Sequence, residues 1–230
     1  MKTGLGIKRK LKKIYIGIKV SNKPKIFCIG ANKTGTTSIK AALKEMGFIV
    51  APQRPAEKMI DQWPKRDFQK LIKFCKYSGE AFQDAPFSFP YTYVVLDYFF
   101  SNSKFILTIR NNAEQWYKSL TNFHAKMWGE NGRIPTKKDL QNANYLYKGS
   151  PWFGNRQLFN TPEDEPYKKD VLIDYYETHN KNVIDYFRHR SKDLLIINVA
   201  KKGAYQKLAS FLKINTKKTE FPWENRTNEK

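Results

Sequence analysis

Short apolar runs alternate with segments of helical periodicity along most of the chain. Each run has the length and composition of a buried strand, and the segment after it repeats apolar residues every three or four positions. The runs cover residues 26–29, 104–110 and 193–199, another ends near residue 84, and a weaker one covers residues 48–50. Strands that alternate with helices predict an α/β fold with three α/β/α layers and a mainly parallel sheet.

The helical segments begin and end at residues that favour helix termini. The first carries Ile39, Ala42, Leu43 and Met46 on one face and stops at Gly47. Further helices are expected at residues 68–75, after Pro90, after the asparagine pair 111–112, at residues 172–187 and at residues 205–212. No repeat or low-complexity linker interrupts residues 25–230, so we expect a single domain there.

One long segment, residues 129–166, lacks this periodicity and is rich in Gly, Pro, Asn and aromatic residues. Loops of this length inside a compact domain are usually lids or substrate-binding loops, so we expect an insert of that kind. Its rings can either stack on the sugar rings of an acceptor or anchor a long loop to the core. They belong to Tyr145, Tyr147, Trp152, Phe153 and Phe159.

The charge of the chain indicates an anionic partner without identifying it. The 230 residues contain 42 Lys and Arg against 21 Asp and Glu, which gives a net charge of +21. Such a charge attracts a phosphate compound, an anionic glycan, a membrane surface or nucleic acid, and it can also be a lysine-rich surface without a ligand. No nucleic-acid-binding motif is present, so nucleic acid is the partner that we expect least.

The first 24 residues form a basic segment that precedes the domain. Their apolar part is short and is interrupted by Lys19, which makes a poor signal peptide, and no run in the chain approaches the ~18 apolar residues of a membrane span. We expect a solvated tail; the alternative is peripheral contact of residues 1–20 with an anionic membrane. Two isolated cysteines, Cys28 and Cys75, suit a reducing, cytoplasmic location.

The turn after the first strand has the composition of a phosphate-binding loop. Residues 30–38 read GANKTGTTS, and they connect a strand to a helix whose backbone N–H groups can bind an anion. In ATP and GTP loops a lysine follows the second glycine, but here Thr36 occupies that position and the lysine is Lys33. A lysine there can neutralise the leaving group on a single 5′-phosphate. The alternative is a strand-to-helix turn without a ligand.

The sequence KTGTT at residues 33–37 resembles the 5′-phosphosulfate loop of sulfotransferases that use PAPS, 3′-phosphoadenosine 5′-phosphosulfate. The strand that ends in Arg110, and the helix that carries Ser119, resemble the 3′-phosphate site of that family, with an interval one residue longer than usual. The last strand, the last helix and the FPWENR tail, which contains Arg226, resemble the bacterial and glycan-type members. The resemblance implies a P-loop NTPase-like sulfotransferase fold.

The same resemblance implies the reaction and its ligands. A sulfuryl group would pass from PAPS to a hydroxyl of a carbohydrate or glycolipid acceptor, PAP would be released, and no metal would be needed. The residues expected to bind PAPS or PAP are Asn32, Lys33, Thr34, Gly35, Thr36, Thr37, Ser38, Arg110, Ser119 and Arg226. Lys33 would also stabilise the charge that develops on the leaving phosphate.

The acceptor hydroxyl needs a general base, and Asp84 is the first candidate. Small-molecule sulfotransferases carry a histidine in a His-x-Pro setting at a comparable place, and glycosaminoglycan sulfotransferases use a carboxylate. Here Asp84 has Pro86 two residues beyond it. An aspartate with an ordinary pKa of about 4 is a weak base, so its surroundings would have to raise the pKa. His124 is the second candidate and Glu80 the third; Asp84 can alternatively be a structural, hydrogen-bonded residue.

Three other functions are compatible with parts of the sequence. A nucleotide kinase would need a lysine after Gly35 and a magnesium-binding aspartate at a strand end, but Thr36 follows Gly35, and the runs at 104–110 and 193–199 end in an arginine and in apolar residues. A non-catalytic basic module would explain the charge but not the two phosphate motifs. A sulfotransferase fold without activity is disfavoured by the presence of Lys33, Asp84 and Arg110.

Overall fold

The computed structural model describes residues 2–222, without the side chains of residues 2–5 and Arg9. Its centre is a sheet of parallel strands in the order β2-β1-β3-β4, which confirms the predicted α/β architecture. The strands are β1 (Ile26–Cys28), β2 (Ala81–Gln83), β3 (Lys104–Thr108) and β4 (Leu194–Ile197). They are shorter than predicted, and residues 48–50 contribute only a bridge between Val50 and Ala81.

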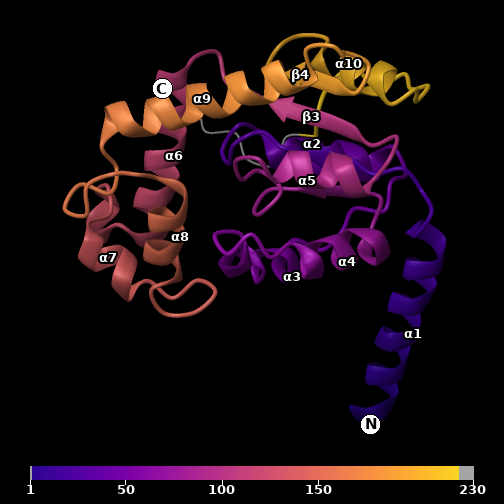
Figure 1. Cartoon of the computed structure of the whole chain (residues 1–230), viewed down its shortest axis with the longest axis horizontal. Coiled ribbons are helices and arrows are strands. Elements are labelled where there is room, and N and C mark those ends of the chain that lie inside the picture. Colours follow the sequence, from indigo (N-terminus) through magenta and orange to yellow (C-terminus); the bar gives the residue numbers. More distant parts are fainter. Residues whose placement is uncertain (1, 223–230) are drawn as a thin grey trace.

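Helices cover both faces of the sheet, as the alternation of its buried side chains requires. Phe27, Phe105 and Leu107 point to one face, which is covered by α4 (Gln69–Ser78), α5 (Thr92–Phe99) and α9 (Lys169–Phe187). Cys28 and Ile106 point to the other face, which is covered by α2 (Thr36–Glu45) and α10 (Ala204–Phe211). The three α/β/α layers are therefore present (Figure 1).

A second group of helices packs beside the sheet rather than on it (Figure 1). It comprises α6 (Ala113–Trp128), η2 (Glu130–Gly132), α7 (Lys137–Asn142) and α8 (Ser150–Leu158). The group has its own core, in which Trp116 of α6 stacks on Tyr176 of α9 with ring centroids 4.7 Å apart. Residues 129–166 are thus not the structureless loop that we expected. Helices of two turns are too short to display a periodic apolar pattern, and α7 depends on a capping box between Thr136 and Asp139.

The amino-terminal segment is also more ordered than expected, because residues 2–20 form the helix α1 (Lys2–Val20). Its last turn is fixed to the body through Gly17, which packs on Tyr77, and through Val20, whose carbonyl accepts a hydrogen bond from the buried Lys25 Nζ at 2.5 Å. The rest of α1 projects away from the body (Figure 1). The expected tail is therefore a helix, although most of its described side chains are exposed, as expected of a solvated segment. No helix in the described part of the chain is long and apolar enough to span a bilayer.

Candidate active site

The loop after β1 lies at the carboxyl edge of the sheet and can only be built with its two glycines. A Cβ atom on Gly30 would lie 2.2 Å from Oγ1 of Thr108 on β3. Gly35 caps α2 with φ at 103°, and a Cβ atom there would lie 2.4 Å from Cγ2 of Val199. The loop is therefore wedged between the end of β3 and the segment that follows β4. This edge of an open parallel sheet is where ligands of such folds bind.

Inside the loop, some polar groups build the scaffold and others point to a ligand. The Thr34 hydroxyl is buried, donates to the carbonyl of Ala31 at 2.5 Å and bonds to Oγ1 of Thr108 at 2.5 Å. The Asn32 side chain accepts a hydrogen bond from Ser88 at 2.8 Å. Both residues were expected to bind the donor; in the structure the Thr34 hydroxyl and the Asn32 side-chain oxygen hold the loop in shape.

The anion-binding groups of the loop are its backbone and the first turn of α2. Among the described residues, no backbone hydrogen bond uses the N–H groups of Lys33, Thr34 or Gly35. The hydroxyls of Thr37 and Ser38 are half-buried. Unpaired N–H groups at a glycine turn, followed by the N-terminus of a ten-residue helix, form a cradle for a phosphate group.

Lys33 supplies the positive charge of this cradle. It adopts a left-handed φ of 71°, which is unusual for a lysine, and its Nζ lies 3.2 Å from the ring centroid of Phe123 on α6. Burial lowers the pKa of Lys33 to about 8, assisted by the nearby Arg110 and opposed by Asp84. A strained backbone and a shifted pKa at the same residue are typical of functional sites.

Arg110, two residues beyond β3, joins the second phosphate motif to the first. Its Nε donates to the carbonyl of Lys33 at 2.7 Å, and its backbone N–H donates to the Tyr176 hydroxyl at 2.9 Å. Ser119 is half-buried on α6, one turn before Phe123, so both residues share the helix face near Lys33. The Ser119 hydroxyl donates to the carbonyl of Gln115 and can still accept a hydrogen bond. Arg226 lies outside the described residues.

Asp84 follows β2 directly and reaches the same edge of the sheet. It has a left-handed φ of 68°, and its carbonyl accepts a hydrogen bond from the backbone N–H of Ser88 at 3.0 Å. Burial and the neighbouring carboxylate of Glu57 raise the pKa of Asp84 to about 6, against the opposing charges of Lys33 and Lys40. The surroundings thus supply the raised pKa that the role of general base requires.

The two alternative bases are placed less favourably. His124 lies near Lys33, but its Nδ1 is hydrogen-bonded to the Tyr167 hydroxyl at 2.8 Å. Burial and the charge of Lys33 lower the pKa of His124 to about 3, so its ring is neutral and weakly basic. Glu80 precedes β2, pairs with Lys23 at 2.9 Å, and therefore lies at the opposite edge of the sheet.

Comparison with known protein families agrees with this geometry. A family model described as a sulfotransferase domain matches residues 25–230, which is nearly the whole chain. The chain belongs to this sulfotransferase family. The match begins just before β1 and leaves α1 outside. No curated protein matches the chain.

Near Asp84, a set of side chains that we name the clasp makes contacts that sequence reasoning missed, although Tyr145 and Tyr147 are among the rings of the insert considered above. It consists of Arg54 and Glu57 on α3 (Gln53–Glu57), Asp61 on η1 (Ile60–Gln62), and Tyr145 and Tyr147 before α8. The Tyr145 hydroxyl donates to Glu57 at 3.0 Å, and the Tyr147 hydroxyl donates to Asp61 at 3.2 Å. Arg54 stacks on the Tyr145 ring at 4.6 Å and donates to the Tyr145 carbonyl. Nothing in the sequence links the two tyrosines to segments some 90 residues away, so no signal could have found these contacts.

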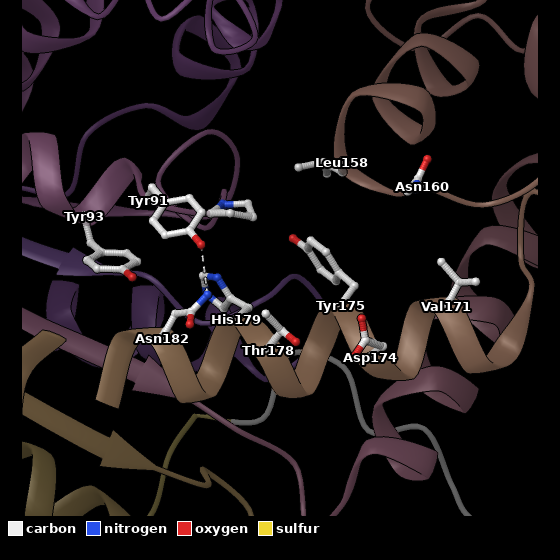
Figure 2. A pocket seen from close by; sticks show the side chains of 11 residues that line it. Tyr91, Tyr93, Leu158, Asn160, Val171, Asp174, Tyr175, Thr178, His179 and Asn182 are labelled. Atoms are coloured by element: carbon white, nitrogen blue, oxygen red, sulfur yellow. Dashed lines mark hydrogen bonds between the residues drawn. The ribbon is translucent and has the colours of Figure 1, made fainter. Parts of the chain in front are cut away.

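Behind the loop, a pocket of about 260 Å³ opens along α9 (Figure 2). Tyr91 and Tyr93 form one side, Leu158 and Asn160 the other, and residues of α9 form the floor. One of these is the buried His179, whose Nε2 donates to the carbonyl of Ile29 at 2.9 Å. Burial lowers the pKa of His179, so its ring is neutral and Nδ1 is an acceptor. The pocket therefore combines aromatic rings with polar groups. It reaches the phosphate loop through His179, which bonds to the residue just before the loop.

The described residues hold no group of three or more His, Cys, Asp or Glu side chains that could bind a metal ion. Charged side chains of the site include Lys33 and Arg110 as cations and Asp84 and Glu57 as anions.

Proposed function

We propose that this sulfotransferase transfers a sulfuryl group from PAPS to a hydroxyl of an acceptor and releases PAP. The observation that carries the proposal is the hydrogen bond between Arg110 and the carbonyl of Lys33, because it joins two phosphate motifs that are 77 residues apart. A ligand with separate 5′ and 3′ phosphate groups matches two cationic positions better than a triphosphate does, since a triphosphate needs one lysine and a metal ion beside one loop.

The residues of the chain fit the donor. The loop N–H groups and the Thr36, Thr37 and Ser38 hydroxyls would hold the 5′-phosphosulfate, which brings an activated sulfuryl group to the site. Arg110 and Ser119 would hold the 3′-phosphate. With a pKa of about 8, Lys33 is mostly protonated at neutral pH and can stabilise charge on the leaving oxygen.

Asp84 would accept the proton of the attacking hydroxyl. With a pKa of about 6, its carboxylate is ionised at neutral pH and is still a better base than an ordinary aspartate. Lys33 and Asp84 lie near enough to each other to affect each other's pKa, as two groups that serve one reaction would. His124 would remain neutral and position the surrounding rings.

For the acceptor we propose a carbohydrate or glycolipid hydroxyl. Aromatic faces near the clasp support this class, because the rings of Trp128 and Tyr145 lie 6.2 Å apart and Tyr145 is bonded to Glu57. The pocket along α9 offers further tyrosines, with amide and carboxylate groups at its rim (Figure 2). Ring stacking combined with polar groups at the edges is the chemistry that recognises sugars.

The donor proposal is tested by calorimetric titration of the full chain with PAP and, separately, with ATP and Mg²⁺. We expect PAP to bind without a metal ion and Arg110→Ala to weaken binding about 10- to 100-fold, since it removes a charge-assisted contact. Arg188→Ala is the matched control, because Arg188 is an exposed arginine at the end of α9. Binding of ATP with Mg²⁺ but not of PAP would instead assign the site to a kinase.

The location of the protein remains a separate prediction. Cys28 and Cys75 are both buried free thiols, which suits a reducing compartment such as the cytoplasm.

Sulfotransfer from labelled PAPS to neutral glycans and glycolipids, measured side by side, would identify the acceptor class.

A further inference from the structure

Helix α1 displays a stripe of large apolar side chains that the body of the protein does not cover. The exposed fractions are 61% for Ile7, 60% for Leu11, 52% for Ile14, 65% for Tyr15 and 76% for Ile18. These positions are spaced by four, three, one and three residues, so they form one continuous face of a helix with 3.6 residues per turn. Apolar patches of this extent on a soluble surface mark an interaction site.

The attachment of α1 directs this stripe away from the body. Gly17 and Val20 are buried, and Ile16 is half-buried, on the side of the helix that packs on α4. A Cβ atom on Gly17 would lie 3.6 Å from the carbonyl of Tyr77, so the contact is close. Because this side is opposite the stripe, the body cannot bury the stripe while α1 stays attached. Figure 1 shows the helix extending from the body into the surroundings.

The rest of the α1 surface is basic. Lys8, Lys12 and Lys19 follow one border of the stripe and Lys10 follows the other, and all four are exposed. Residues 1–20 contain no aspartate or glutamate. An apolar face bordered by lysines, without acidic residues, is the pattern of a helix that lies in an anionic lipid surface.

We propose that α1 lies in the surface of an anionic membrane, with the stripe among the acyl chains and the lysines on the lipid head groups. A second copy of the chain fits less well, because pairing two stripes would bring lysines beside lysines where paired helices use opposite charges. Nucleic acid would leave the apolar stripe exposed. The proposal does not depend on the donor or the acceptor of the reaction.

The test is co-sedimentation of the full chain with vesicles of phosphatidylcholine alone or of phosphatidylcholine mixed with phosphatidylglycerol. We expect strong binding only to the mixed vesicles, and a loss of at least about tenfold in bound protein for the triple variant Leu11→Glu, Ile14→Glu, Ile18→Glu. The double variant Tyr98→Ser, Phe99→Ser is the matched control, because those exposed aromatic residues lie on α5, away from α1. All the substituted side chains are more than half exposed, so the fold is retained; unchanged circular dichroism spectra verify this.

A second variant separates the two contributions to binding. Lys8→Gln, Lys12→Gln, Lys19→Gln keeps the stripe and should abolish the preference for mixed vesicles. The proposal is overturned if wild type and the triple glutamate variant sediment equally with mixed vesicles. It is also overturned if light scattering detects a dimer that the glutamate substitutions dissociate, since the stripe would then be a contact between two copies.

Discussion

Charges in the phosphate loop and in the clasp both shift the pKa of Asp84, yet the two parts are built in different ways. The loop occupies residues 30–38, and its shape comes from two glycines, a buried threonine pair and the end of a neighbouring strand. The clasp joins residues 54–61 to residues 145–147 through hydrogen bonds of side chains, one of them to the Tyr145 carbonyl, and Arg54 is 48% exposed. One side of the site is therefore fixed by backbone geometry, and the other is held by contacts that can be exchanged.

The loop and the clasp also differ in how much stability a substitution would cost. Replacing Gly30 would force a carbon atom into Thr108, so the loop cannot vary without disturbing the core. Exposed hydrogen bonds and ion pairs contribute at most about 1 kcal/mol each, so the clasp can vary with little loss of stability. Under the proposed function, a fixed loop and an exchangeable clasp would allow one donor to serve different acceptors.

Substitution of Asp84 should have the largest effect on activity. Asp84→Asn keeps the size of the side chain and removes the base, so we expect kcat to fall about 10³-fold while the affinity for PAP is retained. His124→Gln is the comparison, and we expect it to cost less than about tenfold, because His124 is neutral and bonded to Tyr167. Steady-state kinetics with labelled PAPS measures both. If His124→Gln lowers kcat more than Asp84→Asn does, His124 on α6 is the general base instead.

Substitution of Lys33 should have the next largest effect on activity. Lys33→Met removes the charge beside the leaving oxygen, and we expect kcat to fall about 10²-fold. Lys40→Met is the matched control, because Lys40 also acts on the charge of Asp84 but lies within α2. The substitution at Lys33 should also raise the pKa of Asp84 further, since Lys33 opposes that rise. Equal losses in the two variants would mean that only the general positive potential matters.

The fold and the position of the phosphate loop were largely predictable because their signals are local. Buried strands, a glycine turn and a lysine within it are read from neighbouring residues, and the sheet then brings Arg110 to the carbonyl of Lys33. The neighbouring sequence does not show which loop hydroxyls face the protein interior. Thr34 is buried against Thr108, a residue 74 positions away.

The rest of the molecule was less predictable because its order depends on distant contacts. The helix α7 has six residues and becomes stable through Leu140, which is buried in the core of α6, α8 and α9. The sequence pattern indicates such a short helix only weakly. The exposed stripe of α1 is difficult to recognise in the sequence, because lysines interrupt it there although they border it in space.

The dependence of the rate on pH should show the two shifted groups. With Asp84 at a pKa of about 6, kcat/KM should fall about tenfold per pH unit below that value, because the base becomes protonated. With Lys33 at about 8, the rate should fall again above that value, as the cation loses its proton. The profile of wild type is compared with that of Lys33→Met. Loss of the alkaline limb in the variant supports the assignment, and an unchanged limb contradicts it.

The clasp should give the smallest effect and the clearest separation of the two sides. Glu57→Gln removes the like charge beside Asp84, so we expect the pKa of Asp84 to fall and the acid limb of the profile to move to lower pH. The same change weakens the bond to Tyr145, and the KM of the acceptor should rise about two- to fivefold while the affinity for PAP stays constant. Asp61→Asn touches only the Tyr147 contact and should leave the acid limb in place. If Glu57→Gln instead weakens PAP binding, the clasp contributes to the donor site, and the division into a fixed and an exchangeable side does not hold.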